Sequence, residues 1–588
     1  MGTELSKHLF LFTLGPVQSF IRQARKTRDL YAGSYILSYL CRGAIESLQL
    51  RCGAKAEIIF PSLEIESLPN RFLAVLTGYE EEELKSIGSG VENDVRHRLL
   101  TMSEKVLTEL QLREPKGFRE QMESLLQVYW VITEQGHDFA ADYKRAESSL
   151  GSLKNLRVFS PLTEQPGRKC SVTGEHNVLF YRGNAGSKRL LAGAVEADPR
   201  FPQKYLGDGE GLGAVAFVKR CADKCMSGNF NPDFPSTGMI ALMNAAKGAN
   251  ISYEELKDWE AQHFFQLKNK MPPSPELSGA DRGRVEKLYK RMEKKEISSY
   301  YAAVIFDADD MGKWLGGKLL PAGTELKDFH TRLSAKMGGY AQTAKDIVKW
   351  PQGVTVYAGG DDFFGFVNLF YLFKVLKALR QEFDRLDLGT NSGGMTFSAG
   401  VAIGHHKTPL TEVLGWAHKM EREAKGVDGK DAVGIALLRR AGETTKAVQK
   451  WKCTDKLWTT DVLVGLLERL GNKTFSDTFI RVLGREFFHL MDEDGMLQND
   501  GFVFAEMKRL LTRACWLEIK PGETKEDFRN RKKWLVEEQA ELLKELYFNS
   551  GSLSNFLSTL NIVTFMDREV NQGDHSTKGA GSSFFPGW

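Results

Sequence analysis

The stretch VYAGGDDFFGF (356–366) constrains the fold of this chain more than any other part of its sequence. Two glycines and two aspartates, Asp361 and Asp362, stand between two apolar runs that each favour a β-strand. A Gly-Gly-Asp-Asp turn alone is ordinary, because glycine and aspartate tolerate unusual backbone angles or cap backbone groups. Two adjacent carboxylates at the mouth of a buried sheet repel each other, however. We therefore expect the turn to bind cations.

A second strand also ends in acids, within FDADDMG (306–312). From residue 300 the pattern predicts a split βαβ, ferredoxin-like order of elements. In that plan the strand ending at Asp307 neighbours the hairpin strand, so Asp307 would lie beside Asp361 and Asp362. The predicted elements are strands at 300–308, 353–358, 363–367, 394–404 and 431–438, and helices at about 325–349, 369–385 and 409–425.

Three carboxylates at one sheet edge suit two Mg²⁺ (or Mn²⁺) ions, which prefer hard oxygen ligands and bring substrate phosphates with them. Two such ions activate an attacking hydroxyl and stabilise a leaving phosphate in an in-line displacement. The glycines of the turn leave room for phosphate oxygens to approach the backbone. Lys425, close to Lys430, could neutralise a triphosphate, although a lysine at a helix C-terminus is also ordinary. The predicted nucleotide site comprises Gly359, Gly360, Ala308 and Lys425.

The same order of elements is predicted at the start of the chain. Strands are expected at 8–14, 56–60, 72–76 and 125–133, and helices after Pro16 and at 33–50 and 81–112. The predicted fold is α+β, with two ferredoxin-like (βαββαβ) domains. The predicted domains are 1–150 (first ferredoxin-like domain), 151–295 (connecting), 296–445 (ferredoxin-like domain with the GGDD turn) and 446–588 (helical, with a flexible Gly/Ser-rich tail).

Composition indicates only the general class of protein and its compartment. The 42% hydrophobic and 26% charged content is typical of a soluble globular protein. A net charge of +3 predicts that any nucleic-acid contact is a local patch. Seven scattered cysteines suit a reducing compartment, and no signal peptide or membrane span is recognisable, so a cytoplasmic protein is expected.

With these residues in hand, the chain resembles the palm domains of nucleotide and diguanylate cyclases. More specifically, it resembles the large polymerase/cyclase subunit of type III CRISPR interference complexes, in its Cmr (III-B) form. The resemblance rests on an ordered set of motifs from about residue 8 to residue 440. These are LGPVQSFIRQARKTRDLYAGSYILS, IIFPS…LPNRFLAVL, RKCSVTGE, YYAAVIFDADDMGKWL, GGDD and TFSAGVAIGHHKTPL.

The resemblance implies an activity. The two ferredoxin-like domains would be paired palm/cyclase domains that hold two ATP molecules. The 3′-hydroxyl of one ATP would attack the α-phosphate of the other, and the products would be cyclic oligoadenylates. Synthesis would begin once target RNA pairs with the guide RNA of a multisubunit Cmr complex. Asp307, Asp361 and Asp362 would hold the metal ions, and Lys425 would contact donor phosphates. The first palm lacks an acidic turn and would seat the acceptor ATP. Ser34 and Asn70 are its predicted contacts, with a helix-start serine and a turn asparagine as the alternative interpretations.

Two departures from the family pattern narrow the expectation. No N-terminal HD nuclease domain is recognisable, and the His137-Asp138 pair is interpreted as a surface pair, so DNA cleavage is not expected. Positions that match the family's four zinc-binding cysteines read Cys170, Thr173, Gly213 and Ala216. Structural zinc needs four nitrogen or sulfur ligands. A set built from Cys170, His176, Cys221 and Cys225 would have an improvised spacing, and no zinc is expected.

Three other functions stay open at this point. The chain could be a free-standing nucleotide cyclase, although that would not need a second palm, a connecting domain and a helical C-terminus. It could transfer AMP to another adenosine-containing acceptor. It could also be a catalytically silent scaffold, against which the acidic cluster weighs.

Overall fold

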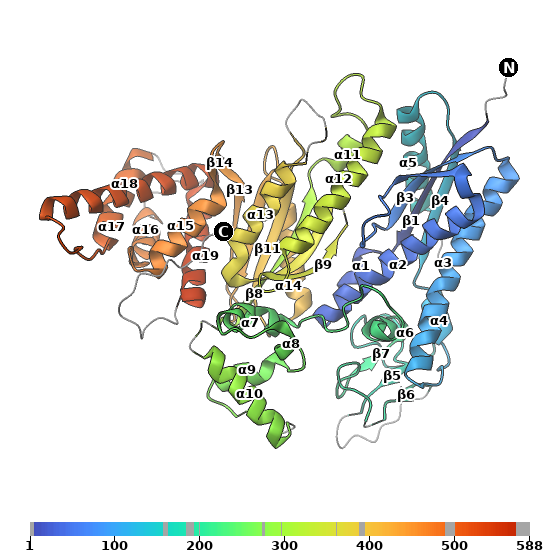
Figure 1. Ribbon diagram of the computed structural model, residues 1–588, viewed down its shortest axis with the longest axis horizontal. Helices are drawn as coiled ribbons and strands as arrows, with labels where there is room; N and C mark the ends of the chain where they lie inside the picture. Colours follow the sequence, from blue (N-terminus) through green and yellow to red (C-terminus); the bar gives the residue numbers. More distant parts are fainter. Residues whose placement is uncertain are drawn as a thin grey trace.

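The computed structural model describes residues 5–156, 163–183, 193–198, 200–272, 277–293, 295, 297–359, 361–386, 388, 394–488 and 500–571. Gly360 of the acidic turn and the predicted flexible tail lie outside the described residues. The first sheet, the second sheet and the C-terminal helices follow one another along the long axis of the molecule, with the connecting elements α7–α10 and β5–β7 below them in Figure 1. The fold is mixed α+β.

The first domain is an antiparallel sheet in the order β2-β3-β1-β4. Side chains of a strand alternate between two faces. In β1, Phe10 and Phe12 therefore pack with α2 and α3, whereas Leu9 and Leu11 face α5 and the second sheet. The elements are β1 (Lys7–Gly15), α1 (Gln18–Arg22), α2 (Thr27–Cys52), η1 (Gly53–Lys55), β2 (Ala56–Phe60), β3 (Arg71–Thr77), α3 (Glu81–Glu109), α4 (Phe118–Glu123), β4 (Gln127–Glu134) and α5 (Phe139–Asn155).

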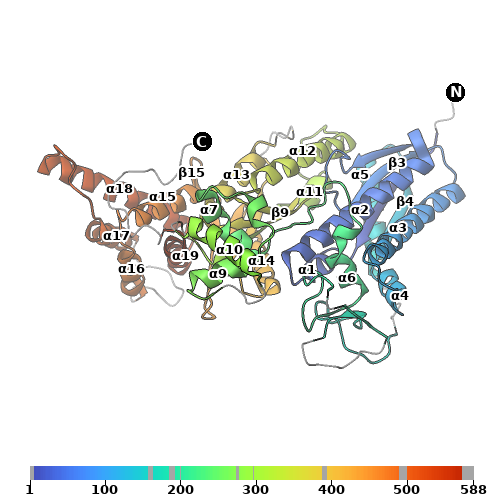
Figure 2. The ribbon, with the colours of Figure 1, turned by 60° about the horizontal axis from the view of Figure 1, so that its bottom comes forward.

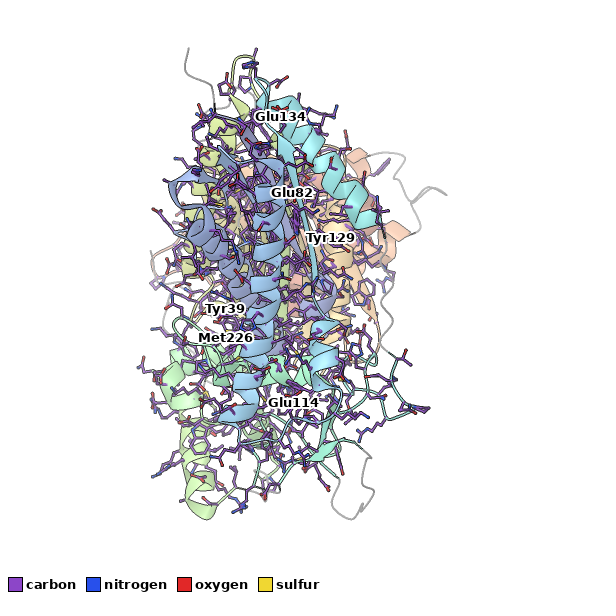
Figure 3. The ribbon with its side chains drawn as sticks, turned by 90° about the vertical axis from the view of Figure 1, so that its right-hand side faces the viewer. Tyr39, Glu82, Glu114, Tyr129, Glu134 and Met226 are labelled. Carbon is purple, nitrogen blue, oxygen red and sulfur yellow. The ribbon has the colours of Figure 1, made fainter. Side chains whose placement is uncertain are left out.

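The strands of this domain were predicted correctly, but the helices differ in three ways. The first helix is the short α1, and the second begins at Thr27 rather than at Gly33. Asp29 accounts for the earlier start, because its carboxylate accepts hydrogen bonds from the backbone N–H groups of Arg25 and Lys26. The helix α5 was not predicted. Figure 3 looks on to α3, whose lower end lies beside the connecting segment. There Tyr39 and Met226 pack against one apolar cluster.

The second sheet has the order β13-β12-β11-β8-β10-β9. One face is covered by α12 and α13, and the other by α14 and α7. The strand β13 crosses the boundary predicted at residue 445, so the sheet continues beyond the predicted palm. Its elements are β8 (Tyr300–Ala308), α11 (Met311–Leu315), α12 (Leu326–Ile347), β9 (Gly353–Ala358), β10 (Asp362–Asn368), η3 (Leu369–Tyr371), α13 (Leu372–Asp384), β11 (Phe397–His405), α14 (Leu410–Lys425), β12 (Ala432–Leu438) and β13 (Thr444–Lys450).

The predicted connecting domain does not share one core. Its first part packs into the apolar core of the first domain. Its second part, α7–α10, forms a separate cluster that lies in front of the second sheet in Figure 2. Asn368 Nδ2 joins the two, because it donates to two carbonyl oxygens of α7. Residues 252–271 have a helical pattern in the sequence, but in the structure they form two helices, α8 and α9. The elements are β5 (Phe180–Tyr181), β6 (Val195–Glu196), β7 (Gly211–Leu212), α6 (Ala214–Arg220), η2 (Ala222–Lys224), α7 (Thr237–Gly248), α8 (Tyr253–Leu256), α9 (Ala261–Lys268) and α10 (Gly279–Met292).

The C-terminal region is helical apart from a short hairpin. Within the predicted helical domain, amphipathic runs in the sequence at 458–470, 503–517 and 526–547 favour helices and correspond to α15, α17 and α18, whereas α16 and α19 were not predicted individually. The helix α19 packs against β13 and so joins this region to the second sheet. No helix in the described part of the chain is long and apolar enough to cross a bilayer. The elements are β14 (Lys452–Thr454), β15 (Leu457–Trp458), α15 (Thr459–Gly471), α16 (Thr478–Phe488), α17 (Asp500–Ala514), α18 (Lys525–Ser550) and α19 (Leu553–Asn571).

Candidate active site

The acidic turn lies against the end of β8. In the antiparallel pair of β8 and β10, Asp307 stands directly opposite Asp362. The Ala308 N–H donates to the Asp361 carbonyl oxygen at 2.8 Å, and the Gly359 N–H donates to the Asp362 carbonyl oxygen at 3.1 Å. The turn is therefore tied both to the neighbouring strand and across its own hairpin. The predicted neighbourhood of the two acidic strand ends is confirmed.

A cavity of about 240 Å³ opens between this strand end and the first domain. Asp307 and Asp362 line it from the second sheet, and Ser34 and Asn70 line it from the first domain. The rest of the wall combines apolar residues, among them Ile21, Leu37 and Leu414, with polar residues of α1 and α14, namely Gln18, Arg22, His418 and Glu421. Apolar surface with convergent polar groups is typical of a small-molecule site.

The two first-domain residues have different roles in this wall. Ser34 lies inside α2 rather than at its start, and its Oγ is buried with no hydrogen-bond partner among the described residues. Asn70 lies just before β3, and its Nδ2 donates to the Leu14 carbonyl oxygen at 2.7 Å and to Thr13 Oγ1 at 3.2 Å. The interpretation of Ser34 as a helix-start serine is therefore wrong, and Asn70 is an anchored residue at a strand end.

Asp361 does not line this cavity. It borders a neighbouring cavity of about 140 Å³, together with Gly359, Arg71 and His330. Side chains alternate along an extended backbone, so Asp361 and Asp362 face different sides of the hairpin. The expected convergence of three carboxylates is thus corrected to two in one cavity and a third beside it. Within the described residues, no three His, Cys, Asp or Glu side chains are gathered closely enough to hold a metal ion as they stand.

The acids of the turn are electrostatically costly in the ion-free protein. Burial raises the pKa of Asp361, an effect that the Arg71 guanidinium opposes. Burial and then the charge of Asp361 raise the pKa of Asp362 to about 7. Moreover, Asp362 Oδ1 is buried with no hydrogen-bond partner in the described structure. Hard carboxylate oxygens whose negative charge is not neutralised, one of them with an unused acceptor position, suit divalent cations such as Mg²⁺.

Lys425 already serves as a counter-ion at this site. Its Nζ forms an ion pair with Asp307 Oδ2 and lies 3.3 Å from Glu421 Oε1. Burial, followed by the charge of Lys430, lowers the pKa of Lys425 to about 8. The helix α14 can hold the lysine there because Gly400 lets it approach the sheet. A Cβ atom at Gly400 would overlap the Ala417 carbonyl oxygen.

Several residues of the site were not singled out from the sequence. Asp309 is 3% exposed and accepts a hydrogen bond from Thr396 Oγ1 at 2.8 Å. Asp310 pairs with Lys430 at 2.8 Å. Both belong to the FDADDMG motif, which could have indicated them. Arg71 of β3 also lies in a quoted motif, LPNRFLAVL, which could have indicated it, whereas His418 and Glu421 of α14 are brought in by tertiary packing and carried no sequence signal.

The remaining expectations concern the surface pair and the cysteines. His137 and Asp138 are exposed, as predicted, and Asp138 caps α5 by accepting from the N–H groups of its first turn. Cys170 and Cys221 are buried in the core of the first domain. Burial raises the pKa of Cys221 and Cys225, the latter to about 12, so these thiols stay protonated at neutral pH. A protonated thiol is a poor metal ligand.

Comparison with known proteins places this geometry in a family. Residues 9–107 match the family model "CRISPR-associated protein Cmr2, N-terminal", and residues 300–434 match "Cas10/Cmr2, second palm domain". The CRISPR system Cmr subunit Cmr2 of Pyrococcus furiosus is 24% identical over a 573-residue alignment. The alignment covers 78% of this chain, which spans 64% of the length of that relative.

Solved structures agree in fold. A chain of the type III-B Cmr-beta complex in the apo state has a TM-score of 0.66 at 14% identity, over 95% of this chain and 82% of the other. A chain of Cmr-beta bound to cognate target RNA has a TM-score of 0.67 at 15% identity, over 96% and 84%. Two Cmr2 family models thus match this chain in order, one in each of the two domains that line the cavity, and the chain is similar to the Cmr2 large subunits of CRISPR complexes, with a match to the Cas10/Cmr2 second palm domain.

Proposed function

We propose that this chain is the large subunit of a type III-B CRISPR RNA-guided antiviral complex and that, on target RNA binding, it converts ATP into 3′-5′-linked cyclic oligoadenylates. One observation carries the proposal. Asp307 and Asp362 face a cavity whose opposite wall is formed by Ser34 and Asn70 of another domain. A two-substrate transfer needs such an arrangement, because both reactants must be held in one geometry.

In this proposal both sheets are ferredoxin-like palm domains. The order β2-β3-β1-β4 of the first sheet is repeated by β9-β10-β8-β11 in the second, and in both the connections are those of a split βαβ unit. The second palm carries the acidic turn and binds the donor ATP. The first palm has no acidic turn and seats the acceptor ATP through Ser34 and Asn70.

Asp307 and Asp362 would hold Mg²⁺ (or Mn²⁺) ions in the cavity that they line, and Asp361, which borders the neighbouring cavity, would have to turn towards these ions to complete the predicted set of three. Bound ions would lower the pKa of the attacking hydroxyl and offset the charge on the departing pyrophosphate. The residues of the chain do the positioning. Lys425 exchanges its ion pair with Asp307 for contacts with donor phosphates. Gly359 and Ala308 are the proposed backbone contacts for phosphate oxygens, and Gly360, the other glycine of the predicted set, lies outside the described residues. The acceptor O3′ forms a bond to the donor α-phosphorus, and the bond from that phosphorus to pyrophosphate breaks.

The proposed partners are guide RNA, target RNA and other Cmr subunits. The similarity to chains of Cmr-beta, one of them in a complex with cognate target RNA, supports this assignment. The net charge of +3 suits a subunit whose RNA contacts are local or are made through its partners.

The test is product analysis with the assembled complex. The complex is incubated with target RNA, labelled ATP and Mg²⁺, and products are separated by chromatography and identified by mass spectrometry. Oligoadenylates support the proposal. A mononucleotide or cyclic dinucleotide would indicate a free-standing type of cyclase, an AMP adduct of another adenosine-containing molecule would indicate a different acceptor, and the absence of product would indicate a scaffold.

A double variant assigns the site. Asp361→Ala combined with Asp362→Ala should abolish synthesis while the complex still assembles, because ion ligands rather than core side chains are lost. Asp346→Ala is the matched control, since Asp346 is an exposed aspartate of α12 that forms an ion pair with Lys349, away from the acidic turn. Near-normal synthesis by the double variant would show that the site is elsewhere.

A further inference from the structure

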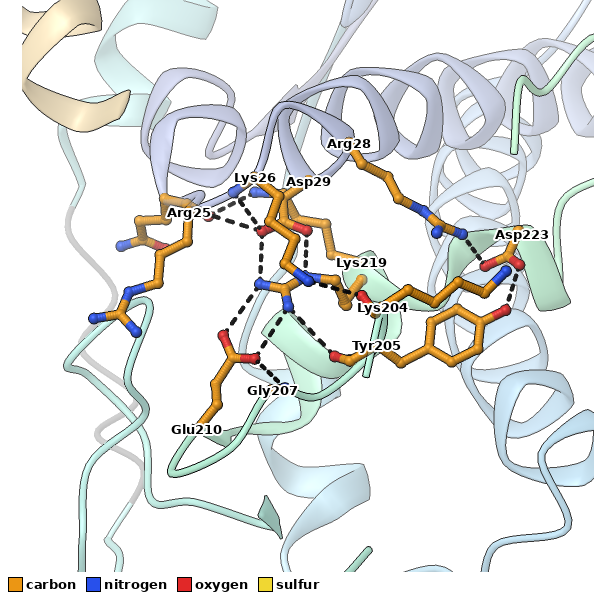
Figure 4. A network of polar contacts seen from close by, with 12 residues as sticks. Arg25, Lys26, Arg28, Asp29, Lys204, Tyr205, Gly207, Glu210, Lys219 and Asp223 are labelled. Carbon is orange, nitrogen blue, oxygen red and sulfur yellow. Dashed lines mark hydrogen bonds and ion pairs between the residues drawn. The ribbon is translucent and has the colours of Figure 1, made fainter. Parts of the chain in front are cut away.

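Two consecutive residues of α6 reach from the connecting segment into the first domain. Lys219 and Arg220 are only 2% and 1% exposed, and Figure 4 shows Lys219 within the polar network beneath α2. Lys219 Nζ donates to the carbonyl oxygen of Ile21 at 3.2 Å, to that of Gln23 at 2.9 Å, and to that of Phe20. These carbonyls lie at the C-terminal end of α1.

Arg220 contacts the start of α2, on the other side of the short segment that separates α1 from α2. Its guanidinium contacts both carboxylate oxygens of Asp29, at 2.5 and 2.9 Å, and Glu210 at 3.2 and 3.3 Å. Asp29 in turn accepts from the N–H groups that precede α2. The pair on α6 therefore contacts both the end of α1 and the start of α2.

The helix α1 is a wall of the proposed nucleotide site. Gln18, Ile21 and Arg22, together with Val17 just before the helix, line the cavity that contains Asp307 and Asp362. A helix of five residues is unstable by itself, because nucleation is costly and its last carbonyls have no partner in the helix. Lys219 supplies that partner from another part of the chain.

Burying an ammonium group is unfavourable unless it is well hydrogen-bonded. Burial lowers the pKa of Lys219 to about 7, and no carboxylate is bonded directly to its Nζ within the described structure. The partners of Lys219 are backbone carbonyls at a helix C-terminus, where a cation is also favoured by the helix dipole. A buried lysine with these partners acts on the position of α1.

We propose that Lys219 is a positioning residue for the acceptor nucleotide: by binding the end of α1 it places the first-domain wall of the cavity at the distance that catalysis requires. The connecting segment, which keeps a single cysteine at the four family zinc positions, is then a structural part of the nucleotide site. This inference rests on the proposed synthesis of oligoadenylates and adds to it the residue that shapes the acceptor side.

The experiment uses the assembled complex with Lys219→Met, which keeps the length of the side chain but cannot donate. Amide hydrogen exchange over residues 17–24 and the dependence of synthesis on ATP concentration are measured. Exchange in this segment should rise at least tenfold. The half-saturating ATP concentration should rise about tenfold, with a change in maximal rate below about threefold, since misplacing a binding wall costs more in substrate capture than in chemistry. In Lys219→Arg, which can still donate, both the hydrogen exchange over residues 17–24 and the half-saturating ATP concentration should lie closer to those of the unmodified complex.

A second variant keeps the test valid if Lys219→Met does not fold. Gly33→Ala favours the helix α2, and a Cβ atom at Gly33 would lie 2.9 Å from Lys219 Cε, so the lysine must move. It should raise exchange in the same segment. Lys224→Met is the matched control, because Lys224 belongs to the same part of the chain and its Nζ lies over the Tyr205 ring at 5.8 Å instead of contacting α1.

The outcomes separate this inference from the proposed function. Unchanged exchange in Lys219→Met or Gly33→Ala would overturn the role of Lys219 at α1. Faster exchange with an unchanged dependence on ATP would show that α1 is not part of the acceptor site, and would also overturn it. If instead the unmodified complex makes no nucleotide product, the proposed function fails, and the exchange result still reports on the contact between Lys219 and α1.

Discussion

Replacing Asp362 by asparagine should make the ion-free protein more stable at pH 8 while removing its response to Mg²⁺. The reason is that the carboxylate of Asp362 is confined beside Asp361, with one oxygen that has no hydrogen-bond partner among the described residues. An amide at this position fills the same space without a charge. The variant therefore separates the requirement for ion binding from the requirement for folding.

The size of the effect follows from the pKa. In the unfolded chain the carboxyl titrates near 3.8, and in the folded protein its pKa is about 7. Because the folded value is higher, the protonated group is accommodated and stability is lost as the pH rises from about 4 to about 7. This difference corresponds to at most about 4 kcal/mol, at about 1.4 kcal/mol for each pKa unit. Solvent at the rim of the cavity screens the charge, so we expect about 2 kcal/mol.

The assay is thermal unfolding of both proteins between pH 4 and pH 8, with and without Mg²⁺. Near pH 4 the two should unfold at similar temperatures. At pH 8 without Mg²⁺ the variant should unfold a few degrees higher. Saturating Mg²⁺ should then stabilise the unmodified protein, by about 2.7 kcal/mol at a hundredfold excess over its dissociation constant, and leave the variant unchanged.

Two results would refute this reasoning. If the unmodified protein shows no pH-dependent loss relative to the variant, the carboxylate is not destabilised by its surroundings. If the variant is stabilised by Mg²⁺ as strongly as the unmodified protein, Asp362 does not hold the ion. Asp346→Asn, at an exposed position, controls for the general effect of removing an aspartate.

Three further predictions concern other residues of the site. Lys425→Met should lower the maximal rate of synthesis about 10- to 100-fold, with Lys425→Arg retaining more activity, because a preorganised cation is lost; a normal rate in both would exclude a role in donor binding. Ser34→Ala should raise the half-saturating ATP concentration several-fold without lowering the stability of the protein, because the buried Ser34 hydroxyl has no hydrogen-bond partner in the described structure. An ATP titration checks the first expectation and thermal unfolding checks the second. Gly400→Ala should destabilise the protein by about 1–3 kcal/mol and reduce synthesis, because the added Cβ pushes α14 and with it Lys425 away from Asp307; unchanged unfolding would show that α14 does not rely on this close approach.

Local patterns were sufficient for the strands and for the acidic turn. Apolar runs bounded by turn residues located β1, β3, β8 and β10 closely, because a strand buried on both faces leaves a short apolar signature. The split βαβ order then placed Asp307 beside Asp362, which the register confirms. Polar residues matched by family motifs, Ser34 and Asn70, also proved to line the cavity.

Contacts between distant segments decided the rest. The break between α1 and α2 is contacted by Lys219 and Arg220, almost 200 positions further along the chain, and no local periodicity could show these contacts. The separation of the connecting segment into two cores, the added strand β13 and the pairing of Lys425 with Asp307 have the same origin.

The sequence by itself therefore determined which residue types meet at the rim of the second sheet, because turn chemistry and strand alternation act over a few residues. Only the tertiary structure decided how they are used, turning Asp361 towards Arg71 and Asp362 towards Ser34 and Asn70. The physical reason is that a carboxylate's surroundings, and so its charge and its partners, are set by whatever the fold packs against it.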